Sequence, residues 1–254
     1  MAEGTVGRVA ALYDIHGNAP ALEAVLADVR AASAELIVIG GDVIPGPMPV
    51  ETIALLRDCG IPIAAIQGNG DREILLRRAG IHSDTVPERF RGVMTWVAEA
   101  LRPKDVAWLA TWPATLRLEV RGLGAVLFCH ATPRNDLDIF TRLTPEEALR
   151  PLFEPAGVPT VVCGHTHMAF SRTVGAGRVV NPGSVGVPFG DPGAYWMMLD
   201  GEIVFRHTEY DLAGAAARVR ATAYPQAEEF AAGSILAPPT EEAMLAAFAK
   251  VPLS

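Results

Sequence analysis

The early part of the chain alternates short apolar runs with longer segments of helical character. Three runs are apolar almost throughout, at residues 8–13, 36–39 and 61–66. Such runs are typical of strands that are buried on both faces of a sheet. Helices are expected between them, at residues 21–32, where Pro20 suits the first turn, and at about 50–59. The strand–helix–strand–helix–strand order predicts a parallel sheet covered by helices.

The second half of the chain has a different pattern, in which strands follow one another closely. Residues 115–120 and 125–128 flank Arg121-Gly122-Leu123-Gly124, and residues 194–199 and 203–209 flank Asp200-Gly201. Both interruptions are hairpin signals, so antiparallel strand pairs are expected here. Further strands are expected at residues 158–163 and 178–180.

The remaining patterned segments are expected to be helical. They are residues 87–109 with a break near Pro103, a helix that starts at residues 144–147, and the Ala-rich residues 212–250. A further helix is expected after the third strand, with Asp71 as its N-cap. Pro225 and Pro238-Pro239 divide the last segment into two or three helices. No linker is visible, so we expect one domain over residues 1–254 with a C-terminal helical segment at about 211–254.

Composition narrows the class of protein. Half of the 254 residues are hydrophobic, enough to bury a large core, and the formal net charge is −8. This acidic balance argues against a stable complex with nucleic acid and against binding to anionic membranes. The sequence shows neither a signal peptide nor an apolar run of the ~18 residues that a membrane helix needs, so we expect a cytoplasmic protein.

The three cysteines, Cys59, Cys129 and Cys163, are an odd number and lie far apart in the sequence. A disulfide framework is therefore not expected. Cys129 and Cys163 lie close to histidines that could bind a metal, but we interpret them as small buried apolar residues rather than as ligands.

Side chains that can bind metal ions follow five of the predicted strands at their carboxyl ends. They are Asp14 and His16, then Asp42, then Asn69, then His130, then His165 and His167. Ligands bind outside the carboxyl ends of strands in open α/β sheets, so these side chains are expected to meet. The pair His165 and His167 alone would also fit an ordinary surface turn, but five such strand ends in one chain indicate a metal site.

Seven donors are too many for one tetrahedral zinc ion and suit two ions that share a carboxylate. Mixed oxygen and nitrogen donors admit Mn, Fe, Zn or Ni, and ligand softness does not select among them. Two divalent ions are therefore the expected cofactors, with Mn²⁺ as the first choice. The other two histidines, His82 and His207, have no such setting and are expected to lie at the surface or to be bonded locally.

The order of these motifs resembles the calcineurin-like metallophosphoesterase superfamily, and more narrowly its small bacterial and archaeal phosphodiesterases. The motifs are Asp-x-His at 14–16, Gly-Asp at 41–42, Gly-Asn-x-Asp at 68–71, His130, and Gly-His-x-His at 164–167. The resemblance spans residues 6 to about 210, and Asn181-Pro182-Gly183-Ser184 also recurs in this group. It implies an α/β fold in the form of a four-layer α/β/β/α sandwich, with two mixed sheets flanked by helices and the metals at the sheet edges.

The resemblance also implies a division of the ligands. Asp14, His16 and His167 would bind the first ion, and Asn69, His130 and His165 would bind the second. Asp42 would bridge the two ions, which are typically ~3.5–4 Å apart in such centres. Each ion lowers the pKa of bound water, so a metal-bridging hydroxide can attack phosphorus at neutral pH. Two ions, two carboxylates and one hydroxide leave a local charge of about +1, which allows an acidic protein to bind phosphate.

One position departs from the family pattern. The family's Gly-Asn-His-Asp is here Gly68-Asn69-Gly70-Asp71, so the histidine that assists the leaving group is missing, as it often is in the small phosphodiesterase branch. Loss of a general acid can cost ~10²–10⁴-fold in rate, least for good leaving groups. The expected substrates are therefore phosphodiesters or activated phosphates. Without its partner, Asp71 fits a plain helix cap as well as it fits a catalytic role.

Two arginines are candidates for binding phosphate oxygens. Arg134 follows the ligand His130 closely, and a guanidinium there can bind phosphate in a bidentate manner. Arg72 is a weaker candidate from the loop of Asn69, and either side chain fits an exposed salt bridge equally well. Asn18 is expected either to hydrogen-bond near the first metal or only to form the turn.

Three functions are weighed. The first is a dimetal phosphoesterase, most simply a phosphodiesterase that takes a phosphate-ester small molecule or a nucleotide. The second is a non-catalytic scaffold on the same fold that binds a protein partner, as the retromer subunit of this superfamily does. The third is a structural metal protein without turnover. Retention of all seven ligands favours catalysis.

Specificity is expected to lie in residues 87–112, in the loop 134–142 and in the helical tail. The Ala-rich tail also offers a surface for a second subunit in a homo-oligomer.

Overall fold

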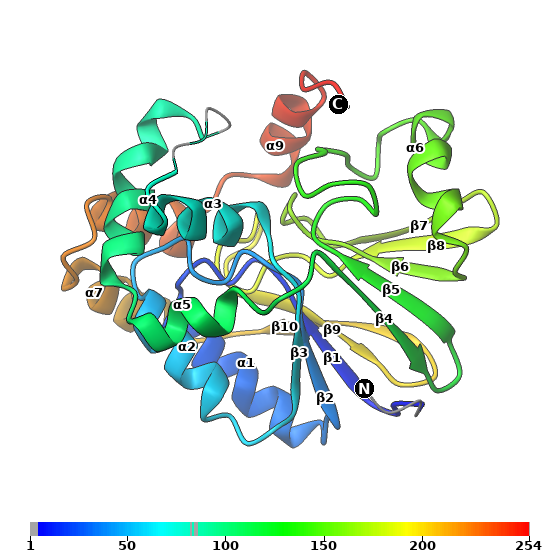
Figure 1. The fold of residues 1–254 in the computed structure, drawn as a ribbon, viewed down its shortest axis with the longest axis horizontal. Coiled ribbons are helices and arrows are strands. Elements are labelled where there is room, and N and C mark those ends of the chain that lie inside the picture. The colour runs from blue at the N-terminus through cyan, green and yellow to red at the C-terminus, as the bar shows by residue number, and fades with distance from the viewer. Residues whose placement is uncertain (1–4, 82, 84–85, 254) are drawn as a thin grey trace.

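The computed structural model describes residues 5–81, 83 and 86–253. Two five-stranded sheets lie face to face with helices outside them (Figure 1). The α/β sandwich implied by the family resemblance is therefore confirmed. His82, one of the two histidines assigned no metal role, lies outside the described residues.

The first sheet has the strand order β10-β9-β1-β2-β3. Strands β1 (Val9–Leu12), β2 (Leu36–Ile39) and β3 (Ile63–Ala65) are parallel, as the buried apolar runs predict. The hairpin of β9 (Ala194–Leu199) and β10 (Ile203–Thr208) completes the sheet, with β9 antiparallel to β1.

The second sheet has the order β4-β5-β6-β8-β7. The hairpin of β4 (Thr115–Val120) and β5 (Gly124–Cys129) starts it, and β5, β6 (Thr160–Val162) and β8 (Gly177–Asn181) are parallel. Strand β7 (Phe170–Val174) pairs antiparallel with β8 and was not expected from the sequence. The sequence gives no strand signal here because the three central residues of β7 are polar and exposed or half-buried. Only Phe170 and Val174 at its two ends are buried.

The helices lie close to the predicted positions, and most ends differ by one or two residues. They are α1 (Ala19–Ala31), α2 (Pro49–Arg57), α3 (Asn69–Arg78), α4 (Glu88–Ala100), α5 (Pro103–Leu109), α6 (Glu146–Phe153), α7 (Leu212–Arg220), α8 (Ala227–Phe230) and α9 (Glu241–Phe248). A 3₁₀ turn (Glu154–Ala156) follows α6, and a π-helical turn (Ala231–Leu236) follows α8.

The predicted start of α3 was wrong. Gly68 is its N-cap and Asn69 its first residue, whereas Asp71 was expected to be the cap. Asp71 lies in the first turn, and its Oδ2 accepts a hydrogen bond from the N–H of Gly68 at 3.2 Å. This is one half of a capping box; the glycine cap has no side chain to make the reciprocal bond to the N–H of Asp71.

Three hydrophobic clusters lie between the four layers. One joins the first sheet to its helices, and it includes Leu12, Val25 and Trp196. A second lies between the sheets and includes Val38 and Phe128. A third lies between the second sheet and α6. Each strand of the sheet interior thus buries both faces, as its apolar composition requires.

Tyr13 joins the two sheets next to the carboxyl ends of their parallel strands. Its side chain is fully buried, and its hydroxyl donates a hydrogen bond to the carbonyl oxygen of Val162 at 3.1 Å. Gly40 and Gly164 lie against its ring, so a Cβ atom added there would come within 2.0 Å and 2.4 Å of ring carbons. The absence of side chains at both glycines therefore allows the strand ends to approach each other.

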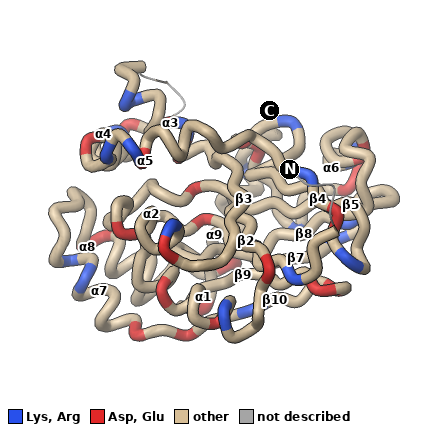
Figure 2. The backbone as a smooth tube through the Cα atoms, turned by 60° about the horizontal axis from the view of Figure 1, so that its bottom comes forward, with Lys and Arg blue, Asp and Glu red and all other residues tan. Residues whose placement is uncertain are grey.

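Charged residues of both signs are spread over the helices and strand ends of both halves (Figure 2). In the part of the chain that the structure describes, no helix has the length and apolar composition needed to cross a lipid bilayer.

We predict that Gly40→Ala destabilises the protein, because the new methyl group would overlap the Tyr13 ring. Overpacking of this kind costs about 1–3 kcal/mol, which corresponds to a fall of roughly 3–10 °C in the thermal midpoint. Gly92→Ala in α4 is the matched control, since nothing lies within 4 Å of an added Cβ there. Differential scanning calorimetry measures both, and equal midpoints for Gly40→Ala and the unmodified protein would contradict the packing role.

Candidate metal centre

The loops after β1, β2, β3, β5 and β6 bring the predicted metal ligands to one place between the two sheets. Three loops come from the first sheet and two from the second, and all follow the carboxyl ends of parallel strands. The residues that meet there are Asp14, His16, Asp42, Asn69, His130, His165 and His167.

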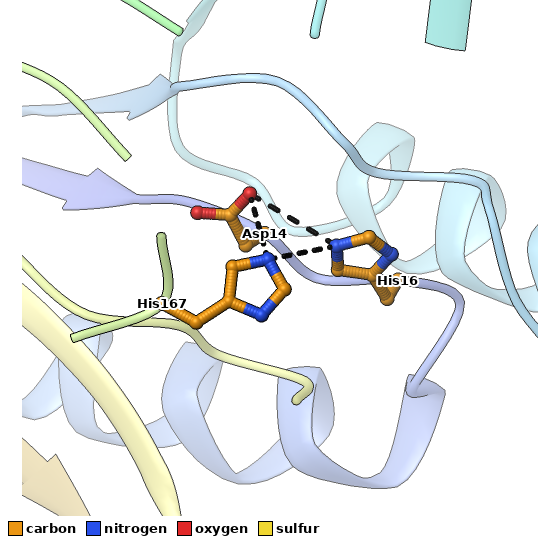
Figure 3. A group of neighbouring side chains, drawn as sticks. All are labelled: Asp14, His16 and His167. Carbon is orange, nitrogen blue, oxygen red and sulfur yellow. Dashed lines mark hydrogen bonds and ion pairs between the residues drawn. The ribbon is translucent and has the colours of Figure 1, made fainter. Parts of the chain in front are cut away.

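The first group of donors consists of Asp14, His16 and His167 (Figure 3). Nε2 of His167 lies 3.4 Å from Oδ1 of Asp14, and Nε2 of His16 lies 3.9 Å from the same oxygen. The two histidine Nε2 atoms are 3.3 Å apart. One carboxylate oxygen and two ring nitrogens therefore face a common point, which is the arrangement that one metal ion requires.

Asp42 lies between the first group and the second. Its Oδ2 is 3.7 Å from Nε2 of His16, and its Oδ1 is 3.7 Å from Nε2 of His130. In the second group, Oδ1 of Asn69 lies 3.1 Å from Nε2 of His130, and the rings of His130 and His165 have centroids 5.1 Å apart. Asp42 thus directs one oxygen to each group, as a bridging carboxylate would.

Three of the histidines are oriented by backbone carbonyl groups. Nδ1 of His16 lies 3.1 Å from the oxygen of Pro45, and Nδ1 of His130 lies 2.9 Å from the oxygen of Gly40. Nδ1 of His167 lies 2.9 Å from the oxygen of Val187. A carbonyl oxygen only accepts hydrogen bonds, so these contacts place the proton on Nδ1. Nε2 then presents a lone pair to the centre, as in histidines that bind metals.

The Asp14 carboxylate shows that the centre fits a cation. It is fully buried, and its Oδ2 accepts a hydrogen bond from the N–H of His165 at 3.0 Å. Its Oδ1 has no hydrogen bond of normal geometry within the described residues, although Nε2 of His130 also lies only 3.9 Å away. A buried carboxylate oxygen without a donor is costly unless a cation neutralises it.

The ionisable groups of the centre perturb one another. Burial alone would raise the pKa of Asp14, but the neighbouring His167, His130 and His16 lower it well below its usual value. Burial and the nearby His130 lower the pKa of His165 to about 4. Burial also opposes protonation of His130, but the carboxylates of Asp42 and Asp14 outweigh it and raise that pKa. Asp14 is therefore ionised and His165 neutral at pH 7, the states in which they bind metals.

The backbone of the ligand loops is unusual. Asp14, His16, Asp42, His165 and His167 all have positive φ angles, between 48° and 67°. Ser33 is the one other non-glycine residue in the described ranges with this conformation. Left-handed backbone is uncommon in residues with a Cβ, and it clusters where function fixes a side-chain direction.

The phrase Asn181-Pro182-Gly183-Ser184 has a positioning role that the sequence analysis missed. Nδ2 of Asn181 donates to the oxygen of Gly164 at 2.8 Å and so fixes the turn that carries the two histidines. Oγ of Ser184 donates to the oxygen of Asp14 at 2.7 Å and accepts from the N–H of Val187 at 2.9 Å. The four-residue phrase was visible in the sequence, but only the fold shows which loops it connects.

The other predicted residues have structural surroundings. Cys129 and Cys163 are buried, with their sulfur atoms near backbone oxygens, and burial raises the pKa of both thiols. Asn18 caps α1 through the N–H of Ala21 and also donates to the oxygen of Gly186, so it forms the turn. His207 lies at the surface, stacked on Tyr195 and bonded to the oxygen of Pro192.

Both arginine candidates form ion pairs with nearby aspartates. Arg134 forms an ion pair with Asp138 at 3.1 Å, and Arg72 forms a two-pronged pair with Asp136 at 2.7 Å and 3.2 Å. These contacts match the salt-bridge interpretation of both side chains. A role for Arg134 in binding phosphate stays a prediction.

Asp71 connects two ligand loops. Its Oδ1 accepts hydrogen bonds from the N–H groups of Val43 and Ile44 at 2.9 Å and 3.1 Å, in addition to the bond from Gly68 to Oδ2. Burial and the nearby Asp42 raise the pKa of this carboxyl to about 7. The contacts favour a structural role in which Asp71 holds the loop of Asp42 against the start of α3. A catalytic role for Asp71 also stays a prediction.

Gly70 occupies a position without room for a side chain. A Cβ atom added there would lie 2.5 Å from Cγ of Pro45 and 3.0 Å from Oδ1 of Asp42. The N–H of Gly70 donates to the same Asp42 oxygen at 2.7 Å. At the position where the family motif has histidine, Pro45 therefore fills the space next to the backbone of Gly70.

The fold and the donor cluster together define a metallophosphoesterase-type protein. The chain belongs to the calcineurin-like phosphoesterase superfamily, since the profile of that domain matches residues 8–202. The family assignment made from the motif order is thereby confirmed.

Similar proteins come from archaea and bacteria. An uncharacterized protein of Methanocaldococcus jannaschii is 26% identical over 197 residues, which cover 71% of this chain and 76% of that protein. A metallophosphoesterase structure from Sphaerobacter thermophilus is 25% identical with a TM-score of 0.67, covering 90% of this chain and 98% of that one. A hypothetical protein from Pyrococcus horikoshii shares the fold, with a TM-score of 0.79 at 20% identity, covering 92% and 100%.

We predict that a divalent ion stabilises the chelator-treated protein through these ligands. At a free Mn²⁺ concentration 100 times the dissociation constant the gain is about 2.7 kcal/mol, or roughly 5–10 °C in the thermal midpoint. His167→Ala should lose most of this shift, whereas His207→Ala, outside the centre, should keep it. A full shift in His167→Ala would show that the ion binds elsewhere.

We also predict that Gly70→Ala weakens metal binding by at least about fivefold, because the added methyl group pushes against Pro45 and Asp42. The double variant Gly70→Ala/Pro45→Ala removes the nearest clashing atom and should recover part of the affinity. Titration calorimetry with Mn²⁺ measures all three proteins. Equal losses in the single and double variants would exclude Pro45 as the cause.

Proposed function

We propose that this protein is a dimetal phosphodiesterase that hydrolyses phosphodiesters or activated phosphates. The observation that carries the proposal is the position of Asp42, which directs one oxygen toward His16 and the other toward His130. The donors on its two sides are the two ligand groups expected for paired ions. When bound, such ions supply Lewis acidity and lower the pKa of water, so that hydroxide is available at neutral pH as the nucleophile.

The residues of the chain would hold and orient the reacting groups. Asp14 and Asp42 would reduce the charge of two divalent ions without cancelling it, so that an anionic phosphate would be attracted to an acidic protein. The carbonyl oxygens of Pro45, Gly40 and Val187 fix the imidazole rings before the substrate arrives. Preorganised ligands of this kind need no rearrangement during the reaction.

The surroundings of Gly70 support a substrate with a good leaving group. Asp71 uses both oxygens for backbone N–H groups, and the position of Gly70 has no room for an acidic side chain. Departure of the leaving group is therefore expected to depend on its own stability as an anion. This favours aryl esters, activated diesters and anhydrides over simple alkyl monoesters.

A non-catalytic scaffold that binds a protein partner is the second candidate. It would need no ligand orientation, but three imidazoles are aligned by carbonyl groups and five ligand residues have left-handed backbone. Such backbone strain costs stability, and a scaffold that only binds a protein partner has no need of it. The identity of the ions as Mn²⁺, the absence of a stable nucleic-acid complex and the homo-oligomer remain predictions.

We predict Mn²⁺-dependent hydrolysis of bis(4-nitrophenyl) phosphate, measured as release of 4-nitrophenolate. His165→Ala and His130→Ala should each lower kcat/KM by at least about 100-fold, because loss of a partner in the outer shell of a metal already costs 10–100-fold. His207→Ala serves as the surface control and should retain full activity. Absence of turnover with Mn²⁺, Zn²⁺, Ni²⁺ and Fe²⁺, despite a metal-dependent thermal shift, would favour the scaffold.

A further inference from the structure

A cavity of about 550 Å³ opens directly onto the metal centre. His16, Asp42, Asn69, His165 and His167 line one side of it. Its other walls come from α4 and the residues before it, from the loop after β5, from the segment around α8 and the π-helical turn, and from Val187 and Phe189 after β8. The first three lie in the segments in which the sequence analysis placed specificity.

The wall formed by α4 is a continuous apolar surface. Phe90, Val93, Met94 and Val97 all line the cavity. Their spacing of three and four residues places them on one face of the helix. Val93 and Val97 are buried, which anchors the helix, while Phe90 and Met94 are half-buried and present their side chains to the cavity.

The opposite walls are also apolar. Leu137 and Ile139 contribute from the loop after β5, and Tyr224 and Phe230 contribute from the C-terminal segment. The polar side chains that this segment adds to the lining are those of Gln226, Glu229 and Ser234, and Ser234 lies on the π-helical turn. Single π-helical turns in helices are frequent at functional sites. A mostly apolar cavity with a few polar groups is typical of a small-molecule site.

The charges of the lining decide which phosphate compounds fit. Among the described residues of the cavity wall, none is Lys or Arg; Glu73 is paired with Arg72 at 3.0 Å, and Glu229 is acidic. A second or third phosphate group beyond the metal centre would therefore meet a mostly apolar lining without a basic side chain of its own. Polyphosphate chains are disfavoured, whereas an uncharged apolar group gains from leaving water.

We propose that the substrate is a singly charged phosphodiester with one bulky apolar substituent, an alkyl chain or an aryl ring, which this cavity binds while the phosphate lies at the metal centre. The inference rests on the proposed function for the position of the phosphate. It adds the chemical class of the group that the enzyme recognises.

Binding of non-hydrolysable analogues tests the cavity without turnover. Alkyl(methyl)phosphinates carry one charge and have no ester bond, and their alkyl chain can be methyl, butyl or octyl. With the Mn²⁺-loaded protein, titration calorimetry should give a dissociation constant at least about tenfold lower for butyl than for methyl, because each buried methylene contributes about threefold. The heat-capacity change should become more negative with chain length. A dissociation constant that does not depend on chain length would overturn the proposal.

Variants of the α4 face test the location. Met94→Gln keeps the length of the side chain but adds an amide, and Phe90→Ala removes a ring. Each should reduce the ratio of methyl to octyl dissociation constants by at least about fivefold. Glu99→Gln, on an exposed position of the same helix, should leave the ratio unchanged. Unchanged ratios in both cavity variants would exclude α4 as the binding surface.

A third comparison separates the substrate classes. A dinucleoside tetraphosphate should compete with the octyl phosphinate more weakly than methyl(phenyl)phosphinate does. Tighter binding of the tetraphosphate would overturn the proposal. A chain-length dependence in a protein that hydrolyses no diester would refute the proposed function and leave an apolar binding cavity.

Discussion

The contact on which the rest of the structure depends is that of the buried Asp14 carboxylate with imidazoles from its own loop and from two loops of the second sheet. One oxygen accepts the N–H of His165, and the other faces His167, His16 and His130 without a hydrogen bond of normal geometry. A buried negative charge is tolerated only where positive charge compensates it. The two sheets therefore have to place the carboxyl ends of their parallel strands next to each other. The hydrogen bond from the Tyr13 hydroxyl to the carbonyl oxygen of Val162 in the second sheet holds them in this position.

This arrangement stores backbone strain in the ligand loops. Five ligand residues have left-handed φ angles, each at a cost of order 1–3 kcal/mol unless local bonds compensate. The compensation is visible in the neighbouring loops, where Asp71 binds three backbone N–H groups and Ser184 binds the backbone of Asp14 and Val187. Residues outside the donor set thus determine the geometry of the donors.

The departure at Gly70 and the apolar cavity point to the same kind of substrate. Pro45 lies beside Gly70, and both residues line the cavity. A centre without a neighbouring acid works best on good leaving groups. A cavity without cations in its described wall selects a substrate with one charge. The proposed chemistry therefore favours a leaving group that is stable as an anion, and the lining of the cavity favours a substrate with a single charge.

The sequence by itself determined the parallel strands, the helices between them and the seven ligand candidates, because apolar runs and the residues at their ends are local signals. It did not reveal β7, whose centre is polar, and it misplaced the cap of α3, because Asp71 acts from inside the first turn. Only the tertiary structure decided that Asp42 faces both donor groups, that Arg72 and Arg134 are engaged in ion pairs, and that Phe90, Leu137 and Phe230 share one cavity. Those relations join residues far apart in the chain, and no local pattern encodes a distance between them.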